Sequence, residues 1–175
     1  MSRPTDTRAR IQAVARELFV RQGVQNTSLR QISDQLGITK PALYYHFASR
    51  DDLVRSIIQP LLDDMERFLD GREPGGDPRE LLEDHFDLIW RHREVIVMVV
   101  RELSVLSYLD LGKRMMAWRQ RLIVLLLGEN VTTAERIRAT VALGGMSDCS
   151  VEYAHLPLEE VKPTAVGAAA AALGL

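Results

Sequence analysis

The stretch GITKPALYYHF, residues 37–47, combines a proline, two tyrosines, a histidine and a phenylalanine in one short segment. Projected as a helix at roughly 100° per residue, Leu43 and Phe47 point to the same side. Tyr45 points nearly opposite. The other side chains expected to face outward are Pro41, Ala42, Tyr44 and His46. One face of this helix is therefore expected to be buried, while the other meets a partner.

A second helix precedes this segment. In NTSLRQISDQLG, residues 26–37, either Thr27 or Ser28 can cap the helix, and Gly37 ends it. Three residues at helical spacing are expected to face inward: Leu29, Ile32 and Leu36. Thr39 can then cap the next helix, with Pro41 in its first turn, where a missing N–H has no cost. Two helices around a glycine-centred turn, at about residues 28–47, predict a helix-turn-helix.

In that motif the second helix enters the DNA major groove, with its N-terminal residues at the base edges. Lys40, Tyr44, Tyr45 and His46 are suitable donors to phosphate oxygens. Residues 1–55 hold nine Lys or Arg, counting Arg3, against five acids, while the remainder is acidic. This asymmetry fits a polyanion partner but is also compatible with a merely solvated face.

The pattern is helical along the whole chain, and no alternating strand pattern is present. We expect an all-α protein of about nine helices, with a DNA-binding domain over residues 1–52 and a C-terminal helical domain over residues 53–175. The fourth helix is expected from about Arg50 towards Leu69, with a kink at Pro60. The later expected segments are a helix from Asp77, apolar segments at about 95–106 and 109–127, a helix from Thr133, and a last helix at 164–173.

Composition excludes several classes of protein. With 175 residues, 46% hydrophobic content and a net charge of -2, the chain is an ordinary globular protein. The longest apolar runs, residues 95–100 and 122–127, are far shorter than the ~20 residues of a membrane span. The N-terminus has no signal-peptide core. One cysteine, Cys149, excludes an internal disulfide, so we expect a soluble cytoplasmic protein without membrane association.

The sequence carries no enzymatic signature. A P-loop, a glycine-rich dinucleotide turn and a nucleophile motif are all missing, so we expect neither an enzyme nor a cofactor. His85 and His92 can share a helix face, but no third ligand stands at metal spacing, and a structural or surface role is expected. Cys149 is expected to be a small core residue rather than a redox sensor.

Residues 11–53 resemble the N-terminal domain of the TetR family of transcriptional repressors. The resemblance is carried by Phe19–Gly23, Thr27–Ser28, Leu36–Ile38, Leu43–Phe47 and Arg50. It implies that Thr27 and Ser28 contact backbone phosphate. It also implies base contacts from Thr39, Lys40, Pro41 and Ala42, and phosphate contacts from Tyr44, Tyr45, His46 and Arg50. Arg50 stands where the family usually has lysine, and Pro41 where it often has a small residue.

The C-terminal part is rich in large adaptable side chains, which either fill the core or line an apolar ligand cavity between helices. The candidate pocket residues are Trp90, Met98, Tyr108, Met115, Trp118 and Met146. Small residues in the last two helices let another helix approach closely, and the resemblance implies a dimer interface there. The candidate interface residues are Val141, Gly144, Gly145, Ala168, Ala169 and Ala172.

These observations together predict a homodimeric, sequence-specific DNA-binding regulator. The resemblance implies repression at a palindromic operator in double-stranded DNA and release by a hydrophobic or amphipathic small-molecule effector. The alternatives are an all-α enzyme and a scaffold that has lost DNA binding. A gel shift with DNA from upstream of the gene separates these classes. The effector and the operator sequence have no signature in the chain.

Overall fold

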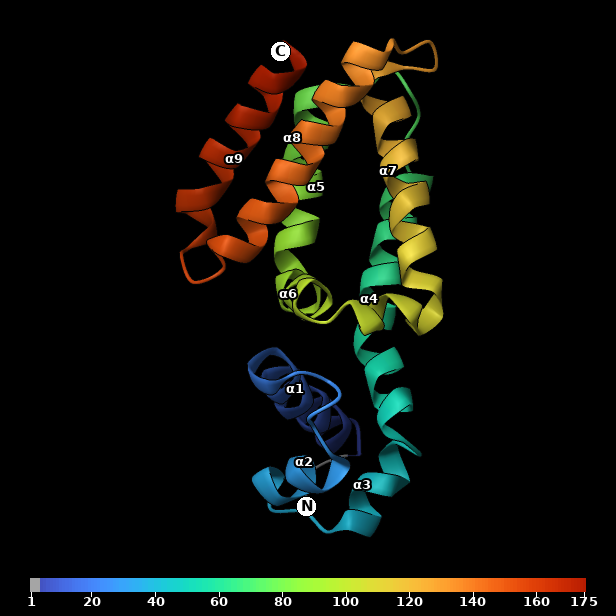
Figure 1. The fold of residues 1–175 in the computed structure, drawn as a ribbon, viewed down its shortest axis with the longest axis vertical. Helices are drawn as coiled ribbons and strands as arrows, with labels where there is room; N and C mark the ends of the chain where they lie inside the picture. The colour runs from blue at the N-terminus through green and yellow to red at the C-terminus, as the bar shows by residue number, and fades with distance from the viewer. Residues whose placement is uncertain (1–3) are drawn as a thin grey trace. The chain divides into compact units, whose positions relative to one another are not determined.

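The computed structural model describes residues 4–175, so the first three residues of the predicted DNA-binding domain, Arg3 among them, lie outside it. The described residues form nine α-helices and one 3-10 helix without a strand, which confirms the all-α prediction (Figure 1). The elements are α1 Pro4–Gln22, α2 Leu29–Leu36, α3 Lys40–His46, α4 Arg50–Asp70, α5 Pro78–Arg91, α6 Arg93–Arg101, η1 Leu103–Asp110, α7 Leu111–Leu127, α8 Thr133–Glu152 and α9 Leu158–Leu173.

The helices form two compact units. One comprises the residues up to Leu62 together with Glu94–Leu111, and the other comprises Asp63–Arg93 and Gly112–Leu175. The boundary expected between residues 52 and 53 falls inside the first of these units. The first unit therefore holds the predicted DNA-binding helices together with part of α4, most of α6, and η1.

In the first unit, α1 packs on α2, and α2 packs on α3. Apolar residues at helical spacing on α1 are buried, as are residues of α2, α3 and the residue after α3. The core of these three helices comprises Ile11, Ala15, Leu18, Phe19, Ile32, Leu43 and Phe47. The predicted inward positions Leu29, Ile32, Leu43 and Phe47 are thus confirmed, whereas Leu36 is half-buried.

Helix α4 continues through Pro60, where a kink was expected. A proline has no N–H to donate to the carbonyl four residues earlier, which here belongs to Ser56. The Gln12 side-chain amide of α1 donates to that carbonyl at 3.2 Å and to the Ser56 hydroxyl at 3.0 Å. The carbonyl left free by Pro60 therefore has a donor from α1.

The segment between α6 and α7 differs from the sequence expectation of two long apolar helices. Helix α6 ends at Arg101, and the 3-10 helix η1 follows. Leu109 and Asp110 then adopt left-handed backbone conformations, with φ of 55° and 54°. Residues with a Cβ rarely adopt this conformation, and two in succession break the helix before α7 begins at Leu111.

In the second unit, α8 packs on α9, and α5 contacts both helices (Figure 1). Helix α8 begins at Thr133, as predicted, and Thr132 caps it in a reciprocal pair with Glu135. Helix α9 begins at Leu158, six residues before the expected start, and Pro163 lies inside it. Glu159 and Glu160 occupy its first turn, where carboxylates interact favourably with the helix dipole.

Candidate nucleic-acid interface

Ser28 is the residue that caps α2. Its hydroxyl accepts a hydrogen bond from the Gln31 N–H at 3.2 Å, and the Gln31 side chain accepts one from the Ser28 N–H at 2.8 Å. This reciprocal arrangement is a capping box. Thr27, the other candidate cap, is 1% exposed. Its hydroxyl donates to the Gly23 carbonyl at 2.8 Å, so Thr27 is oriented inward, which does not fit the predicted phosphate contact.

The turn between α2 and α3 requires its glycine. Gly37 has a φ of 64°, in the left-handed region that glycine adopts without strain. Its N–H donates to the Asp34 carbonyl, and the N–H of Ile38 donates to the Ser33 carbonyl at 3.1 Å. The Thr39 hydroxyl then accepts from the Ala42 N–H at 3.3 Å and starts α3. These contacts form the predicted helix-turn-helix.

Helix α3 has one buried and one open face. Leu43 and Phe47 are fully buried, whereas Tyr45 is 81% exposed and Tyr44 is 44% exposed. His46 is half-buried, and its ring packs edge-on against Tyr45 at 5.2 Å between centroids. The remaining predicted contact residues of this helix are exposed: Thr39, Lys40, Pro41 and Ala42. The predicted division of the aromatic side chains is therefore confirmed.

Arg50 is held by its own chain. Its guanidinium donates to the carbonyls of Val24 at 3.2 Å and Gln25 at 3.1 Å, and to the Gln25 side chain at 3.1 Å. The sequence predicted a phosphate contact here and gave no sign of these bonds. The hydrogen bonds of Arg50 thus connect the start of α4 to the turn between α1 and α2.

Three residues that the sequence analysis did not single out also hold this unit together. Arg8 donates to the His46 carbonyl at 2.8 Å. Glu102 accepts from the Val24 N–H, and Arg101 donates to the Val20 carbonyl. These partners are 38 to 81 residues apart in the sequence, so no local spacing could have shown them.

The predicted ligand-pocket set divides between the two compact units. Trp90, Trp118 and Met146 are buried in the second unit, while Met115 of the same unit is 41% exposed. The other two members, Met98 and Tyr108, are buried in the first unit. The Tyr108 hydroxyl donates to Asp51 at 2.9 Å, and burial raises its pKa.

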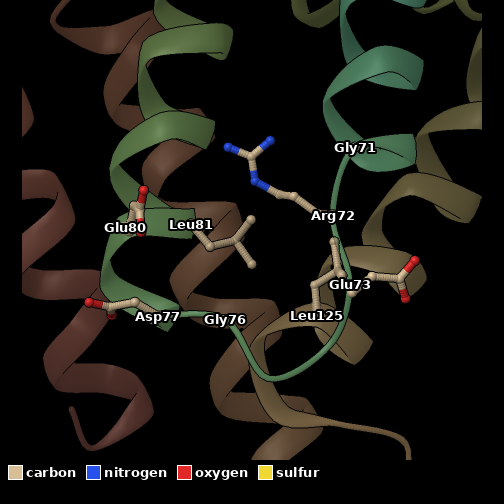
Figure 2. A pocket seen from close by; sticks show the side chains of 8 residues that line it. All are labelled: Gly71, Arg72, Glu73, Gly76, Asp77, Glu80, Leu81 and Leu125. Carbon is tan, nitrogen blue, oxygen red and sulfur yellow. The ribbon is translucent and has the colours of Figure 1, made fainter.

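Two surface clefts of the second unit are polar and contain none of the predicted pocket residues. The first is formed by the α4–α5 loop, the start of α5 and Leu125, and Arg72 and Asp77 are among its lining residues (Figure 2). The second lies along α4 and α5, with the Arg72–Asp84 ion pair among its lining residues. Both are lined by charged side chains, unlike the predicted apolar site.

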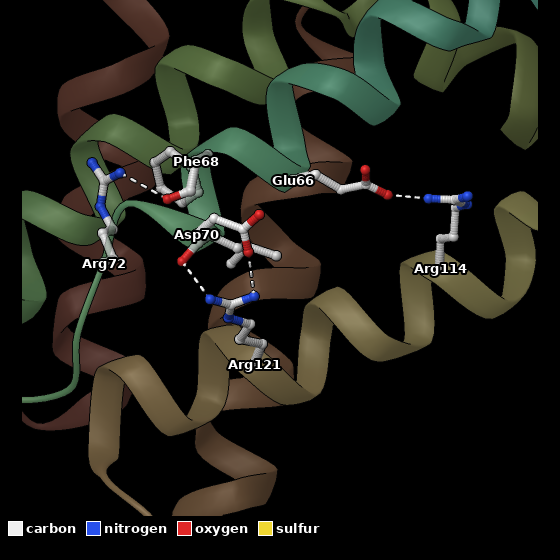
Figure 3. A network of polar contacts seen from close by, with 7 residues as sticks. Glu66, Phe68, Asp70, Arg72, Arg114 and Arg121 are labelled. Carbon is white, nitrogen blue, oxygen red and sulfur yellow. Dashed lines mark hydrogen bonds and ion pairs between the residues drawn. The ribbon is translucent and has the colours of Figure 1, made fainter.

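Charged contacts also fix the C-terminal half of α4 in the second unit. Arg121 of α7 donates to Asp70 at 2.7 Å and to the Leu69 carbonyl at 2.9 Å, and Arg114 pairs with Glu66 (Figure 3). Asp64 accepts a hydrogen bond at 2.8 Å from His92, the residue that follows α5, and this bond lowers the pKa of Asp64. Among the described residues no cluster of His, Cys, Asp or Glu has the geometry of a metal site.

The predicted dimer residues lie on α8 and α9. Val141 is 61% exposed, Gly145 and Ala168 are exposed, and Gly144 and Ala172 are half-buried. Ala169 differs from the expectation, because it is buried within its own chain. A Cβ at Gly144 or Gly145 would meet no atom of the chain within 4 Å. No helix of the described part is long and apolar enough to span a membrane.

Comparison with known proteins agrees with this geometry. Residues 11–57 match the family model of bacterial regulatory proteins, tetR family. The chain is 29% identical over 98 residues to ArpR of Pseudomonas putida, a probable HTH-type transcriptional regulator, covering 56% of this chain and 43% of that protein. It is 41% identical over 58 residues to an HTH-type transcriptional regulator of Staphylococcus aureus, covering 33% of this chain and 31% of that protein.

The fold is also similar to a solved structure. A transcriptional regulator of the TetR/AcrR family from Aquifex aeolicus is 22% identical and aligns over 92% of this chain and 96% of that chain, with a TM-score of 0.72. At this identity the likeness concerns the fold alone. The match of residues 11–57 supports a DNA-binding regulator of the TetR family, and the structural likeness supports its all-helical fold. The chain spans less than half the length of the curated relatives it matches.

Proposed function

We propose that this protein is a homodimeric transcriptional repressor that binds a palindromic operator through α3 and is released by a small molecule. The observation that carries the proposal is the division of α3 into a buried face and an open face. Leu43 and Phe47 fix the helix in the core, which leaves Lys40, Tyr44 and Tyr45 accessible. Ammonium and phenol groups on a helix-turn-helix are suited to phosphate oxygens and base edges.

The dimer is supported by the composition of the open surfaces of α8 and α9. On α9 the exposed positions from residue 163 to the end of the helix at Leu173 carry no charge, and α8 adds Ile137, Val141 and Gly145. A helical surface of small and apolar side chains lets a second copy approach closely and bury apolar area. In such a dimer the α3 helices of the two copies are related by a two-fold axis, which matches the symmetry of a palindromic operator.

The effector proposal rests on the second unit, where the large apolar side chains of Trp90, Trp118 and Met146 are buried. Ligand sites in helical bundles are formed by such side chains. A hydrophobic or amphipathic compound that binds one conformation more tightly than the other shifts the population away from the DNA-binding state. TetR-family regulators are not enzymes, and this chain is expected to act by binding alone.

The proposal is tested by fluorescence anisotropy with DNA from upstream of the gene and with duplexes selected from a randomised pool. We expect the protein to enrich a palindrome and to bind it more tightly than a scrambled duplex of the same length. The Tyr45→Ala variant should bind both duplexes more weakly and stay folded. Equal affinity of the wild type for selected and scrambled DNA would contradict the proposal.

A further inference from the structure

Arg8 of α1 lies across the C-terminal end of α3. Its Nη1 donates a hydrogen bond to the His46 carbonyl at 2.8 Å, and its Cζ atom lies 4.3 Å from the centre of the Phe47 ring. The arginine is on the protein surface, whereas Phe47 is fully buried. The guanidinium of Arg8 therefore contacts both the last residue of α3 and the residue that follows this helix.

Helix α3 depends on such contacts, because it has only seven residues. A helix of this length is not stable in isolation, and its last carbonyl groups have no partner within the helix. Thr39 caps its start, and Leu43 is its only buried residue. At the other end, the Phe47 N–H donates to the Leu43 carbonyl at 3.0 Å. The Arg8 bond is the contact that joins this end to α1.

The chemistry of the contact suits an arginine. A positive charge at a helix C-terminus interacts favourably with the helix dipole, and a hydrogen bond from a charged donor is stronger than a neutral one. The planar guanidinium can also stack over the Phe47 ring while it donates to the His46 carbonyl. Lysine keeps the charge but lacks this planar geometry, so it cannot make both contacts in the same way.

We propose that Arg8 is a positioning residue for DNA recognition. By fixing the end of α3, it holds the whole helix, with the predicted base contacts Thr39, Lys40 and Ala42, in the orientation in which they meet an operator. The inference rests on the proposed function, because it concerns the same helix. Specific recognition requires side chains held in one orientation, whereas non-specific binding depends mainly on the number of phosphate contacts. Loss of the Arg8–His46 hydrogen bond should therefore reduce the discrimination between DNA sequences more than it reduces the affinity for non-specific DNA.

Arg10 provides a matched control. It is an exposed arginine on the same helix, two residues further on. At about 100° per residue it projects from a different side of α1 than Arg8. Arg10→Lys and Arg10→Ala change the same functional group by the same amount, without touching the end of α3. An effect that appears in the Arg8 variants alone is therefore due to the contact with His46 and Phe47.

The first experiment needs no DNA. Amide hydrogen exchange of the segment 43–48 is compared in wild type, Arg8→Lys and Arg10→Lys. We expect faster exchange in this segment for Arg8→Lys and wild-type exchange for Arg10→Lys, with both variants retaining the wild-type melting temperature. Unchanged exchange in Arg8→Lys would overturn the inference, since α3 would then be held without Arg8.

The second experiment measures the affinity for a selected operator and for a scrambled duplex over a range of salt concentrations. Arg8→Lys should lower the ratio of the two affinities roughly tenfold, about the effect of losing one well-placed base contact. Affinity for the scrambled duplex should stay near that of the wild type. Arg8→Ala should lower the ratio by as much, while the slope of log affinity against log salt stays constant. Arg10→Lys should keep the ratio.

Two outcomes would contradict this reading. If Arg8→Lys retains the wild-type ratio of operator affinity to scrambled-duplex affinity, the orientation of α3 does not depend on the Arg8–His46 bond. A slope that flattens by about 0.9 per subunit in Arg8→Ala, with the ratio retained, would make Arg8 a direct phosphate contact instead. If the wild type selects no sequence at all, the proposed function fails, but the exchange experiment still decides whether Arg8 orders α3.

Discussion

The Glu102 carboxylate accepts a hydrogen bond from the backbone N–H of Val24, the residue that follows the left-handed Gly23. The two residues are 78 positions apart, at the end of α6 and in the turn between α1 and α2. Arg50 donates to the carbonyl of the same valine. Both polar groups of Val24 are therefore bound by side chains, and this fixes the turn from which α2 and α3 continue.

The first prediction concerns this carboxylate. Glu102→Ala leaves the part-buried Val24 N–H without its partner, which should lower the free energy of unfolding by about 1–3 kcal/mol. Chemical denaturation measures the change. Glu129→Ala, which removes an exposed carboxylate in the α7–α8 loop, should change the stability by less than about 0.5 kcal/mol. Equal stabilities of the two variants would show that the Val24 bond contributes little.

The second prediction concerns Arg50, for which the sequence suggested only a DNA contact. Because its guanidinium donates to two backbone carbonyls, Arg50→Ala should lower the free energy of unfolding by about 1–3 kcal/mol even without DNA. Arg50→Lys should recover part of this loss. Denaturation of the free protein is the measurement. A variant as stable as wild type that binds DNA more weakly would restore the original interpretation of Arg50 as a phosphate contact alone.

The third prediction concerns the outer face of α3. Tyr45→Phe removes one hydroxyl from a side chain that is 81% exposed, so the stability should change by less than about 0.5 kcal/mol. Operator affinity should fall by roughly tenfold for each hydroxyl-to-phosphate bond that is lost. Tyr153→Phe, an exposed tyrosine after α8, is the control and should leave DNA binding intact. A large drop in melting temperature for Tyr45→Phe would mean that Tyr45 is buried.

The local parts of this site could be predicted from the sequence. Helical projection separated Leu43 and Phe47 from Tyr45, and the capping residue Thr39 located the start of α3, because both signals depend on neighbouring residues. Thr27 and Ser28 were equivalent candidates for the α2 cap. Only the packing of the chain turns the Thr27 hydroxyl towards Gly23 and leaves Ser28 as the cap.

The non-local parts could not be predicted. The bonds of Arg8, Arg50 and Glu102 join residues that are 25 or more positions apart, and no periodicity encodes such pairs. Helix α9 was expected to start later because Pro163 usually ends or precedes a helix. The burial of Val161, two residues before that proline, favours the helix from Leu158 onward. Packing energy thus prevailed over local propensity.

The fourth prediction concerns pH. Burial lowers the pKa of His85 from 6.5 to about 4, so the folded state holds this ring neutral while the unfolded state protonates it at a higher pH. The unfolded state then binds more protons as the pH falls from 6.5 to 4, and stability decreases over this range by up to roughly 3 kcal/mol. His85→Gln should remove most of this decrease in denaturation curves recorded at several pH values.

His155→Gln is the control for that experiment, because it makes the same chemical change at an exposed position. Asp64 affects the free energy of unfolding at lower pH. Its pKa is lowered by the His92 hydrogen bond, so its stabilisation is complete above its unfolded pKa of 3.8 and is lost on further acidification. A wild-type profile that is flat between pH 6.5 and 4 would contradict the assignment of a buried neutral His85.

The last prediction concerns the proposed dimer. Val141 of α8 is 61% exposed in the single chain, beside positions where the glycines leave room for a second helix. Val141→Glu would place a carboxylate in the interface twice, once from each copy, because a two-fold interface uses the same surface of both chains. Burying an unpaired charge has a high cost, so the dimer should dissociate at a concentration at least roughly tenfold higher than wild type.

Met116→Glu is the matched control for Val141→Glu. Met116 is 71% exposed and lies on α7, outside the proposed interface, so the same chemical change should leave the dimer intact. Sedimentation velocity over a concentration series measures both variants, and melting temperatures confirm that each is folded. If Met116→Glu dissociates the dimer and Val141→Glu does not, the two copies associate through α7. A wild type that remains monomeric at micromolar concentration would contradict the dimer itself.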